Sequence, residues 1–210
     1  MTTDLLKALG AGIDALQISL SSEQVGQLWT LQNQLLKWNK TYNLTAISDP
    51  KEVLQLHLLD SLSLVPYWRF QLTLDVGTGA GFPGLPLAIA LPEQQFHLLD
   101  SNSKKIRFIR QQIHQLGLKN VTAFHSRVED HQAQGYDAIV SRAFASLSDM
   151  VELTDHLLKS EGSWMAMKGI YQQEEINALP VAVAQNALHR LNVPGLDAER
   201  CLIELRRLNH

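Results

Sequence analysis

The segment LTLDVGTGAGFPG, from Leu72 to Gly84, constrains the fold more than any other part of the chain. Leu72, Leu74 and Val76 are apolar and compatible with a strand, which predicts a buried central strand that ends at Asp75 and Val76. Glycines then alternate at Gly77, Gly79 and Gly81, as in a tight turn whose backbone approaches a ligand closely. The apolar residues that follow predict a short helix. A strand, a glycine-rich turn and a helix in this order form the nucleotide-binding corner of a doubly wound α/β sheet.

Two classes of cofactor fit this turn. Residues Gly79 to Gly84 match the G-x-G-x-x-G pattern of dinucleotide-binding enzymes, so an NAD-dependent oxidoreductase is one interpretation. Asp75 favours the other, because a carboxylate at the end of the strand would repel a pyrophosphate but can face a cation. S-adenosylmethionine carries a sulfonium and an ammonium group and no phosphate. We therefore favour S-adenosylmethionine, although an acid in this position also serves in some turns simply as a cap.

From Leu72 onward, predicted strands alternate with helices, which is typical of a mostly parallel sheet. The sequence predicts parallel strands at 72–76, 95–100, 120–125, 136–144 and 162–169, a helix at 103–116, and a closing pair of strands at 188–194 and 200–207. This alternation places the chain in the α/β class.

The first third of the chain has a different pattern. Residues 3–65 are predicted to form helices, with a loop from Trp38 to Pro50 in which polar, basic and aromatic residues are interleaved. A chain of 210 residues is long enough to bury a sizeable core in one domain. We predict a single domain over the whole chain, in which an N-terminal helical extension (1–68) precedes a Rossmann-like core (69–210).

Charged residues recur where the predicted strands end. Ligands of open α/β sheets bind outside the carboxyl ends of the strands. Asp100 lies near the offset of about 20 residues from the glycine turn at which an acid binds ribose hydroxyls in such folds. The charged residues that map to successive strand ends are Asp75, Asp100, Glu129, Arg142 and Lys168. We expect all five to surround one crevice.

The amino-acid composition limits the cellular compartment and the binding partners that we expect for this protein. A single cysteine, Cys201, leaves no internal disulfide and no cysteine-rich zinc site, and suits a reducing cytoplasm. The N-terminus lacks the basic-then-apolar order of a signal peptide, and no apolar run reaches the length of a membrane span. We therefore expect a cytoplasmic protein without a membrane partner. The net charge of −3 gives no global attraction to nucleic acid, so RNA binding would need a local basic patch.

A basic patch of this kind is predicted on the helix at 103–116. No acidic residue occurs between Asp100 and Glu129, and six basic residues fall in that interval. Arg107 and Arg110 lie opposite or beside the isoleucine stripe of the helix, on its outward face. Such a face is either ordinary solvated surface or a surface that positions a phosphate backbone. The candidate substrate contacts are Lys104, Arg107, Arg110 and Lys168, and Lys37, Lys40 and Tyr42 add a second basic and aromatic group.

Several motifs together resemble a known family. In chain order they are WNKTYNLT, HLLDS, LDVGTGAGFPGLPLAI, LLDSNSKKIRFIR, SRVED, SRAFASLSDM and MKG. Over nearly the whole chain they are similar to the GidB/RsmG family of bacterial methyltransferases, which modify guanine N7 in 16S ribosomal RNA. The resemblance implies a seven-stranded class I S-adenosylmethionine-dependent methyltransferase fold with an N-terminal helical extension.

The resemblance also implies where the cofactor and the substrate bind. It matches the family's cofactor site to Gly77, Phe82, Val128, Glu129 and Arg142, and Asp100 to the acid that holds the ribose. Gly79, in the same turn, completes our set of candidate cofactor-binding residues. The partner it implies is 16S ribosomal RNA or the small-subunit particle, and we find no clustered carboxylates that would indicate a metal site.

Methylation of guanine N7 needs no general base, since N7 has a free lone pair and carries no proton. The absence of an obvious nucleophile–base pair is therefore expected. His57, Asp60 and Ser61 read as a helix interior with local hydrogen bonds. Arg142 and Lys168 are the donors expected near the cofactor and the base.

Other reactions are less consistent with the sequence. Methylation of cytosine C5 needs a cysteine nucleophile, and Cys201 is expected far from the crevice. An NAD-dependent oxidoreductase and a catalytically silent RNA-binding module stay open as alternatives.

Overall fold

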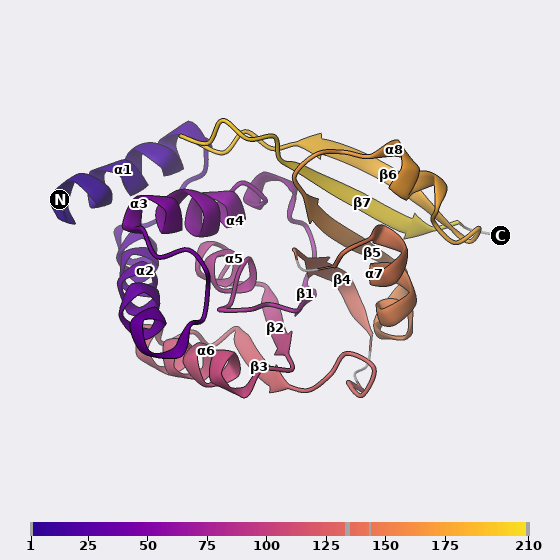
Figure 1. Cartoon of the computed structure of the whole chain (residues 1–210), viewed down its shortest axis with the longest axis horizontal. Coiled ribbons are helices and arrows are strands. Elements are labelled where there is room, and N and C mark those ends of the chain that lie inside the picture. The colour runs from indigo at the N-terminus through magenta and orange to yellow at the C-terminus, as the bar shows by residue number, and fades with distance from the viewer. Residues whose placement is uncertain (1, 133–134, 143, 209–210) are drawn as a thin grey trace.

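The computed structural model describes residues 2–132, 135–142 and 144–208, which form a seven-stranded sheet with helices on both faces (Figure 1). The strand order is β3-β2-β1-β4-β5-β7-β6. The strands are β1 (Leu72–Val76), β2 (Gln95–Asp100), β3 (Val121–His125), β4 (Tyr136–Ser141), β5 (Leu158–Lys168), β6 (Val183–Arg190) and β7 (Cys201–Arg207). Strands β1 to β5 run parallel to one another, and β7 is antiparallel to both β5 and β6. The predicted mostly parallel sheet is confirmed, although β5 and β6 begin earlier than the sequence indicated.

The glycine turn after β1 has the backbone conformation that its sequence predicts. Gly77, Gly79 and Gly81 have φ angles of +65°, +63° and +92°, in the left-handed region that side chains rarely adopt. A Cβ on Gly81 would also collide with the side chain of Leu85. The turn therefore holds its shape only with glycine at these positions, and it leads into helix α5 (Gly84–Ala90).

The N-terminal helices extend further than predicted. They are α1 (Thr2–Ala15), α2 (Ser22–Tyr42), α3 (Pro50–Val53), the π-helix η1 (Leu54–Leu59), α4 (Asp60–Leu62) and the 3₁₀-helix η2 (Val65–Tyr67). Ser21 and Gln24 form a capping box at the start of α2. The predicted loop from Trp38 is wrong over its first turn, because α2 continues to Tyr42. The helix ends at Asn43, whose φ of +51° is typical of a C-cap.

The other helices cover the two faces of the sheet. They are α6 (Ser103–Leu116), α7 (Leu147–Thr154), the 3₁₀-helix η3 (Asp155–Leu157) and α8 (Gln173–Asn177). Successive side chains of β2 divide between two buried clusters, with Leu98 facing α5, α6 and the N-terminal helices and Leu99 facing α7. Figure 1 shows α2, α5 and α6 gathered on one side and α7 on the other. In the ranges described above, no helix combines the length and the apolar character needed to cross a membrane.

Candidate functional site

Asp75 lies beneath the glycine turn, where it holds the turn closed. Its side-chain Oδ2 accepts hydrogen bonds from Thr78 Oγ1 at 2.7 Å and from the backbone N of Gly84 at 2.8 Å, and the residue is 1% exposed. Burial raises the pKa of Asp75 to about 7, against the opposing effect of these two hydrogen bonds. The expectation that Asp75 lines the crevice and faces a cation is wrong, and its alternative role as a cap of the turn is confirmed.

Asp100 stands at the end of β2 and also supports the turn. Its Oδ2 accepts from Gly79 N at 2.9 Å and its Oδ1 accepts from Asn102 N at 2.8 Å. Each carboxylate oxygen has two lone pairs, so both can accept a further hydrogen bond. Beside Asp100 lies a cavity of about 240 Å³, here called the β2 cavity. Its lining includes Gly77, Asp100, Val128, Glu129 and Phe144.

A second cavity, of about 190 Å³, is lined by the glycine turn itself and is called the turn cavity. Its lining includes four predicted cofactor residues, Gly77, Gly79, Phe82 and Arg142, together with Thr45 and His57 from the N-terminal segment. Phe82 is almost fully buried, and its ring stacks on His57 with 4.8 Å between centroids. All seven residues predicted to bind the cofactor therefore line one or both of these cavities around the same turn.

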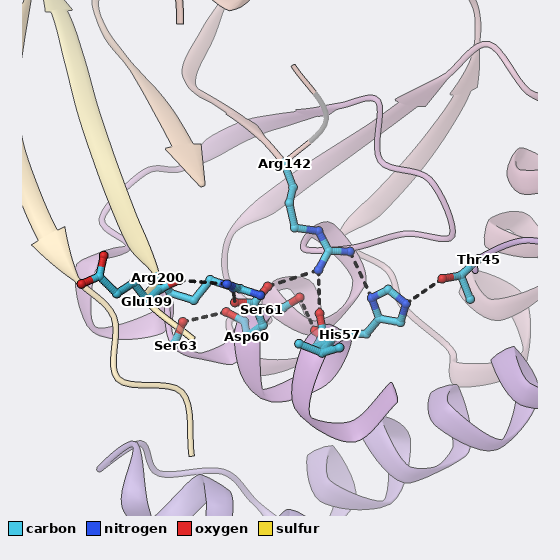
Figure 2. Close-up of polar contacts among 9 residues, drawn as sticks. Thr45, His57, Asp60, Ser61, Ser63, Arg142, Glu199 and Arg200 are labelled. Atoms are coloured by element: carbon cyan, nitrogen blue, oxygen red, sulfur yellow. Dashed lines mark hydrogen bonds and ion pairs between the residues drawn. The ribbon is translucent and has the colours of Figure 1, made fainter. Parts of the chain in front are cut away.

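Arg142 joins the end of β4 to the N-terminal helices (Figure 2). Its Nη1 donates to the carbonyl of Leu56 at 2.8 Å and to Asp60 Oδ2 at 3.2 Å, and its Nη2 lies 3.1 Å from His57 Nδ1. In the π-helix the backbone N–H of Asp60 donates to Gln55 O and His57 O instead of to Leu56 O, its α-helical acceptor. The widened turn thus lets Leu56 present its carbonyl to the guanidinium group.

The protonation state of His57 follows from these contacts. A guanidinium group only donates, so His57 Nδ1 must be the acceptor. The proton of the neutral imidazole is then on Nε2, which lies 3.0 Å from Thr45 Oγ1. Burial, helped by the charge of Arg142, lowers the pKa of His57 to about 3. His57 is therefore a neutral ring with both nitrogens engaged.

Asp60 connects Arg142 to Arg200, which lies just before β7. Arg200 Nε lies 3.4 Å from Asp60 Oδ1, on the opposite oxygen from Arg142, and Figure 2 shows the two arginines reaching the same carboxylate. Burial raises the pKa of Asp60, while the two positive charges act to lower it. Local hydrogen bonds within the helix were expected and do occur at Ser61, which donates to His57 O. The long-range contacts of His57 and Asp60 were not expected.

A third cavity, of about 410 Å³, also has Arg142 in its lining and is called the Lys168 cavity. Its lining includes His57, Asp60, Arg142, Phe144, Lys168, Arg200 and Cys201. Lys168 Nζ donates to Glu175 and to the carbonyl of Ala145. Arg142 and His57 line both this cavity and the turn cavity, so the two cavities are neighbours.

Cys201 is placed differently from the sequence expectation. It pairs with Lys168 at the start of β7 and lines the Lys168 cavity, so the prediction that it lies far from the crevice is wrong. The residue is 4% exposed, and burial raises the pKa of its thiol. A buried thiol of raised pKa is a poor nucleophile, so the case against cytosine C5 chemistry now rests on the environment of the thiol.

The basic residues of α6 lie outside these three cavities. Lys104, Arg107 and Arg110 are exposed, as predicted for an outward face. The guanidinium of Arg107 lies 4.8 Å from the centre of the Tyr42 ring, so the arginine covers one face of this ring. Arg107 thereby links α6 to the end of α2. Among the described residues no group of three or more histidine, cysteine or acidic side chains could hold a metal ion.

The fold and the site define the class of this protein. A central strand that ends in a glycine turn, an acid at the end of the next strand and an antiparallel β7 between β5 and β6 form a class I S-adenosylmethionine-dependent methyltransferase. The structure of a SAM-dependent methyltransferase from Aquifex aeolicus matches 78% of this chain and 96% of its own, with a TM-score of 0.61 and 15% identity, which shows the fold alone.

Sequence relatives identify the family. Residues 24–203 match the family described as "GidB: rRNA small subunit methyltransferase G". Two proteins named ribosomal RNA small subunit methyltransferase G are similar to this chain. The one from Idiomarina loihiensis is 48% identical over 91% of this chain and 93% of its own length, and the one from Hydrogenovibrio crunogenus is 54% identical over 82% and 81%. The chain belongs to this family, and neither the NAD-dependent oxidoreductase nor the silent RNA-binding module has support from these relatives.

Four polar residues of the site were missed from the sequence: Thr45, His57, Asp60 and Arg200. The first three occur in the motifs WNKTYNLT and HLLDS, which carried the resemblance. For His57 and Asp60, polarity within an otherwise apolar helix was the available signal, whereas Thr45 stands in a segment that already contains many polar residues. Nothing in the local sequence marks Arg200.

Proposed function

We propose that this protein transfers the methyl group of S-adenosylmethionine to N7 of a guanine in 16S ribosomal RNA of the small ribosomal subunit. The observation that carries this proposal is that the turn cavity and the Lys168 cavity are neighbours, with Arg142 and His57 in the lining of both. A methyl group presented in the first cavity can be attacked by a base held in the second. Family membership supports the choice of ribosomal RNA as the substrate.

In this proposal the cofactor lies across the glycine turn. Its adenosine occupies the β2 cavity, where Asp100 accepts hydrogen bonds from the ribose hydroxyls and Val128 and Glu129 border the adenine. Its methionine end occupies the turn cavity, against the backbone of Gly77 and Gly79. Phe82 is too buried to contact much of a ligand and acts by holding the ring of His57. Arg142 supplies positive charge beside the methionine end.

The guanine is proposed to enter the Lys168 cavity. Because N7 must be free to attack, the protein reads O6 or the Watson–Crick edge of the base and avoids the paired contact to N7 and O6. Arg142 and Lys168 are the cationic donors placed for this contact. The N7 lone pair forms the new N–C bond as the C–S bond breaks, and the sulfonium becomes a neutral thioether while the imidazole ring of the base becomes cationic.

No proton leaves N7 in this reaction, so the site needs no general base. Among the described residues, His57 is the only histidine that lines these cavities, and it agrees with that requirement because it is neutral and both of its ring nitrogens already have partners. Rate enhancement then comes mainly from alignment of N7 with the methyl carbon, and orientation can lower a barrier by about 7–11 kcal/mol in favourable cases.

The RNA backbone is proposed to bind the outward face of α6, through Lys104, Arg107 and Arg110. Lys37 and Lys40 of α2 extend this basic face, since the contact of Arg107 with Tyr42 holds the two helices together. Phosphate contacts of this kind position the RNA without reading its sequence. We propose 16S ribosomal RNA or the small-subunit particle as the partner and, because ribosomal RNA is the substrate, the cytoplasm as the place of action. The extension (1–68) and the core (69–210) act as one domain, because Arg142 of the core binds His57 and Asp60 of the extension.

Methyl transfer to defined RNA tests the proposal. The substrates are unmodified 16S transcripts and small-subunit particles reconstituted from them, with S-adenosylmethionine labelled in its methyl group. We expect label in the RNA, and borohydride–aniline cleavage at a single guanine. A transcript made with 7-deazaguanosine is the matched control, since it has no N7 and should take up no label. No transfer to either unmodified substrate, or equal transfer to the deaza transcript, would overturn the proposal.

A further inference from the structure

The hydrogen bonds from Arg142 to Thr45 run in one direction. Arg142 donates to His57 Nδ1, so the proton of His57 is on Nε2 and is donated to Thr45 Oγ1 at 3.0 Å. The backbone N–H of Ile47 also donates to Thr45 Oγ1, at 3.2 Å. A hydroxyl oxygen has two lone pairs, and both are therefore occupied. Thr45 can act toward any further group only as a donor.

The remaining hydroxyl proton of Thr45 has no acceptor among the described residues. Thr45 is half-buried and lines the turn cavity together with the glycine turn and Arg142. Two contacts fix its position from the protein side: the donor of His57 described above, and Asn39 Oδ1, which accepts from the backbone N of Thr45 at 2.9 Å. A pre-oriented donor on the wall of a small cavity selects a ligand group that accepts hydrogen bonds.

We propose that Thr45 is a cofactor-contacting residue that donates its hydroxyl hydrogen bond to the carboxylate of the methionine part of S-adenosylmethionine. This inference rests on the proposed position of the cofactor. It adds a contact to the cofactor from Thr45, which lies between α2 and α3 and outside the sheet. The methionine end offers an ammonium group, a sulfonium group and a carboxylate, and of these only the carboxylate accepts hydrogen bonds. The positive charge of Arg142 on the same cavity wall favours the same orientation.

The consequence is that the N-terminal segment completes the cofactor site. Arg142 directly follows β4 of the sheet, whereas Thr45 and His57 belong to the segment before β1. The chain of hydrogen bonds makes the donor of Thr45 depend on the presence of Arg142 and on the tautomer of His57. In this proposal a neutral hydroxyl recognises the carboxylate of the cofactor, and Arg142 sets the direction of that hydroxyl through His57.

Two ligands and two variants test this contact by calorimetry on the full chain. The ligands are S-adenosylhomocysteine and its decarboxylated analogue, which lacks only the carboxylate. Thr45→Val removes the hydroxyl at nearly constant volume, and Thr45→Ser keeps it. We expect Thr45→Val to weaken S-adenosylhomocysteine binding by roughly ten- to a hundredfold, as for a hydrogen bond to a charged acceptor, and the decarboxylated ligand by less than about twofold. Thr45→Ser should bind both ligands as the parent protein does.

Two results would overturn the inference. One is unchanged affinity of Thr45→Val for S-adenosylhomocysteine. The other is an equal loss for both ligands, which would mean that the loop has moved and that the carboxylate is not involved. Should Thr45→Val fail to fold, Thr45→Ala is measured with the same pair of ligands and judged in the same way. Binding of S-adenosylhomocysteine by the parent protein is the separate check on the proposed function, because its absence would remove the cofactor site itself.

Discussion

Asp60 and Arg142 form an ion pair, with 3.2 Å between Oδ2 and Nη1, although they are 82 residues apart in the chain. Arg200 approaches the other oxygen of Asp60. One carboxylate therefore ties together helix α4, the end of β4 and the loop before β7. Its side chain is 3% exposed, so water provides little compensation when a partner is lost.

The first prediction concerns this carboxylate. Asp60→Asn keeps the shape, but its amide nitrogen replaces one of the two carboxylate oxygens, so either Arg142 or Arg200 faces a donor instead of an acceptor. We expect the free energy of unfolding to fall by about 1–3 kcal/mol and affinity for S-adenosylhomocysteine to fall with it, since the anchor of Arg142 is weakened. Asp155→Asn is the matched control, because Asp155 also pairs with an arginine but is exposed. Urea unfolding and calorimetry should show less than about 1 kcal/mol for the control and no change in affinity.

The second prediction is a dependence of stability on pH from Asp75. Its pKa is about 7 in the folded protein and lies near 3.8 in a solvated carboxyl, so between these values the folded state holds a proton that the unfolded state has lost. The contribution of Asp75 to stability is fully present below about pH 4 and is lost as the pH rises to about 7. The free energy of unfolding should then decline by up to about 1.4 kcal/mol per pH unit from this group.

Asp75→Asn provides the comparison, because a neutral amide keeps an acceptor for Thr78 and for Gly84 N. We expect the difference in unfolding free energy between the two proteins to change across this window and to level off above pH 7. Parallel curves for the two proteins would show that Asp75 does not titrate in the folded state.

Local patterns predicted most of the secondary structure, because each pattern is complete within a few residues. The strand at 95–100 and the helix at 103–116 coincide with β2 and α6. The same reasoning extends to the direction of Asp75. Leu74 and Val76 both belong to the cluster that faces α7, and side chains alternate along a strand, so Asp75 must point to the opposite face, under the following helix. Applied to the sequence, this alternation would have argued against a place in the crevice.

The group around Arg142 could not be predicted in the same way. His57 and Arg142 are 85 residues apart, and their contact depends on how the N-terminal helices pack on the sheet. The π-helical turn that frees Leu56 O for Arg142 has no signature in residue composition. The motifs HLLDS and SRAFASLSDM contain His57, Asp60 and Arg142, but only the folded structure shows that these side chains are in contact.

The third prediction tests Asp100 as the ribose acceptor. Asp100→Ala removes both the proposed contact and the acceptor for Gly79 N, so we expect affinity for S-adenosylhomocysteine to fall at least tenfold. Asp100→Asn keeps one acceptor oxygen and should lose less. Asp130→Ala, an exposed acid nearby in the chain, should bind as the parent protein does. Calorimetry that finds the same affinity for Asp100→Ala and the parent would remove Asp100 from the site.

The fourth prediction concerns the basic face of α6. Arg107→Glu and Arg110→Glu each change the local charge by two and should weaken RNA binding, with a shallower dependence of affinity on salt because fewer phosphate contacts are made. Affinity for S-adenosylhomocysteine should not change, since neither residue lines a cavity of the site. Lys7→Glu makes the same change in charge on α1 and should leave RNA affinity nearly unaltered. Loss of both RNA and cofactor binding would point to misfolding, and equal effects of all three variants would refute a specific RNA face.

The last prediction is the pH profile of the chemical step. Because guanine N7 carries no proton to be removed, the rate of a single turnover with saturating cofactor and RNA should be flat between about pH 6.5 and 8.5. His57 cannot introduce a rise in this range, since its pKa is near 3 and both nitrogens are engaged. Asp75 is placed to do so, with a pKa of about 7, and burial also raises the pKa of Asp60. The profiles of Asp75→Asn and Asp60→Asn therefore separate two cases: a rise that disappears in one of these variants reflects that buried carboxyl, whereas a rise that persists in both would reveal a general base and contradict attack by an unassisted nitrogen.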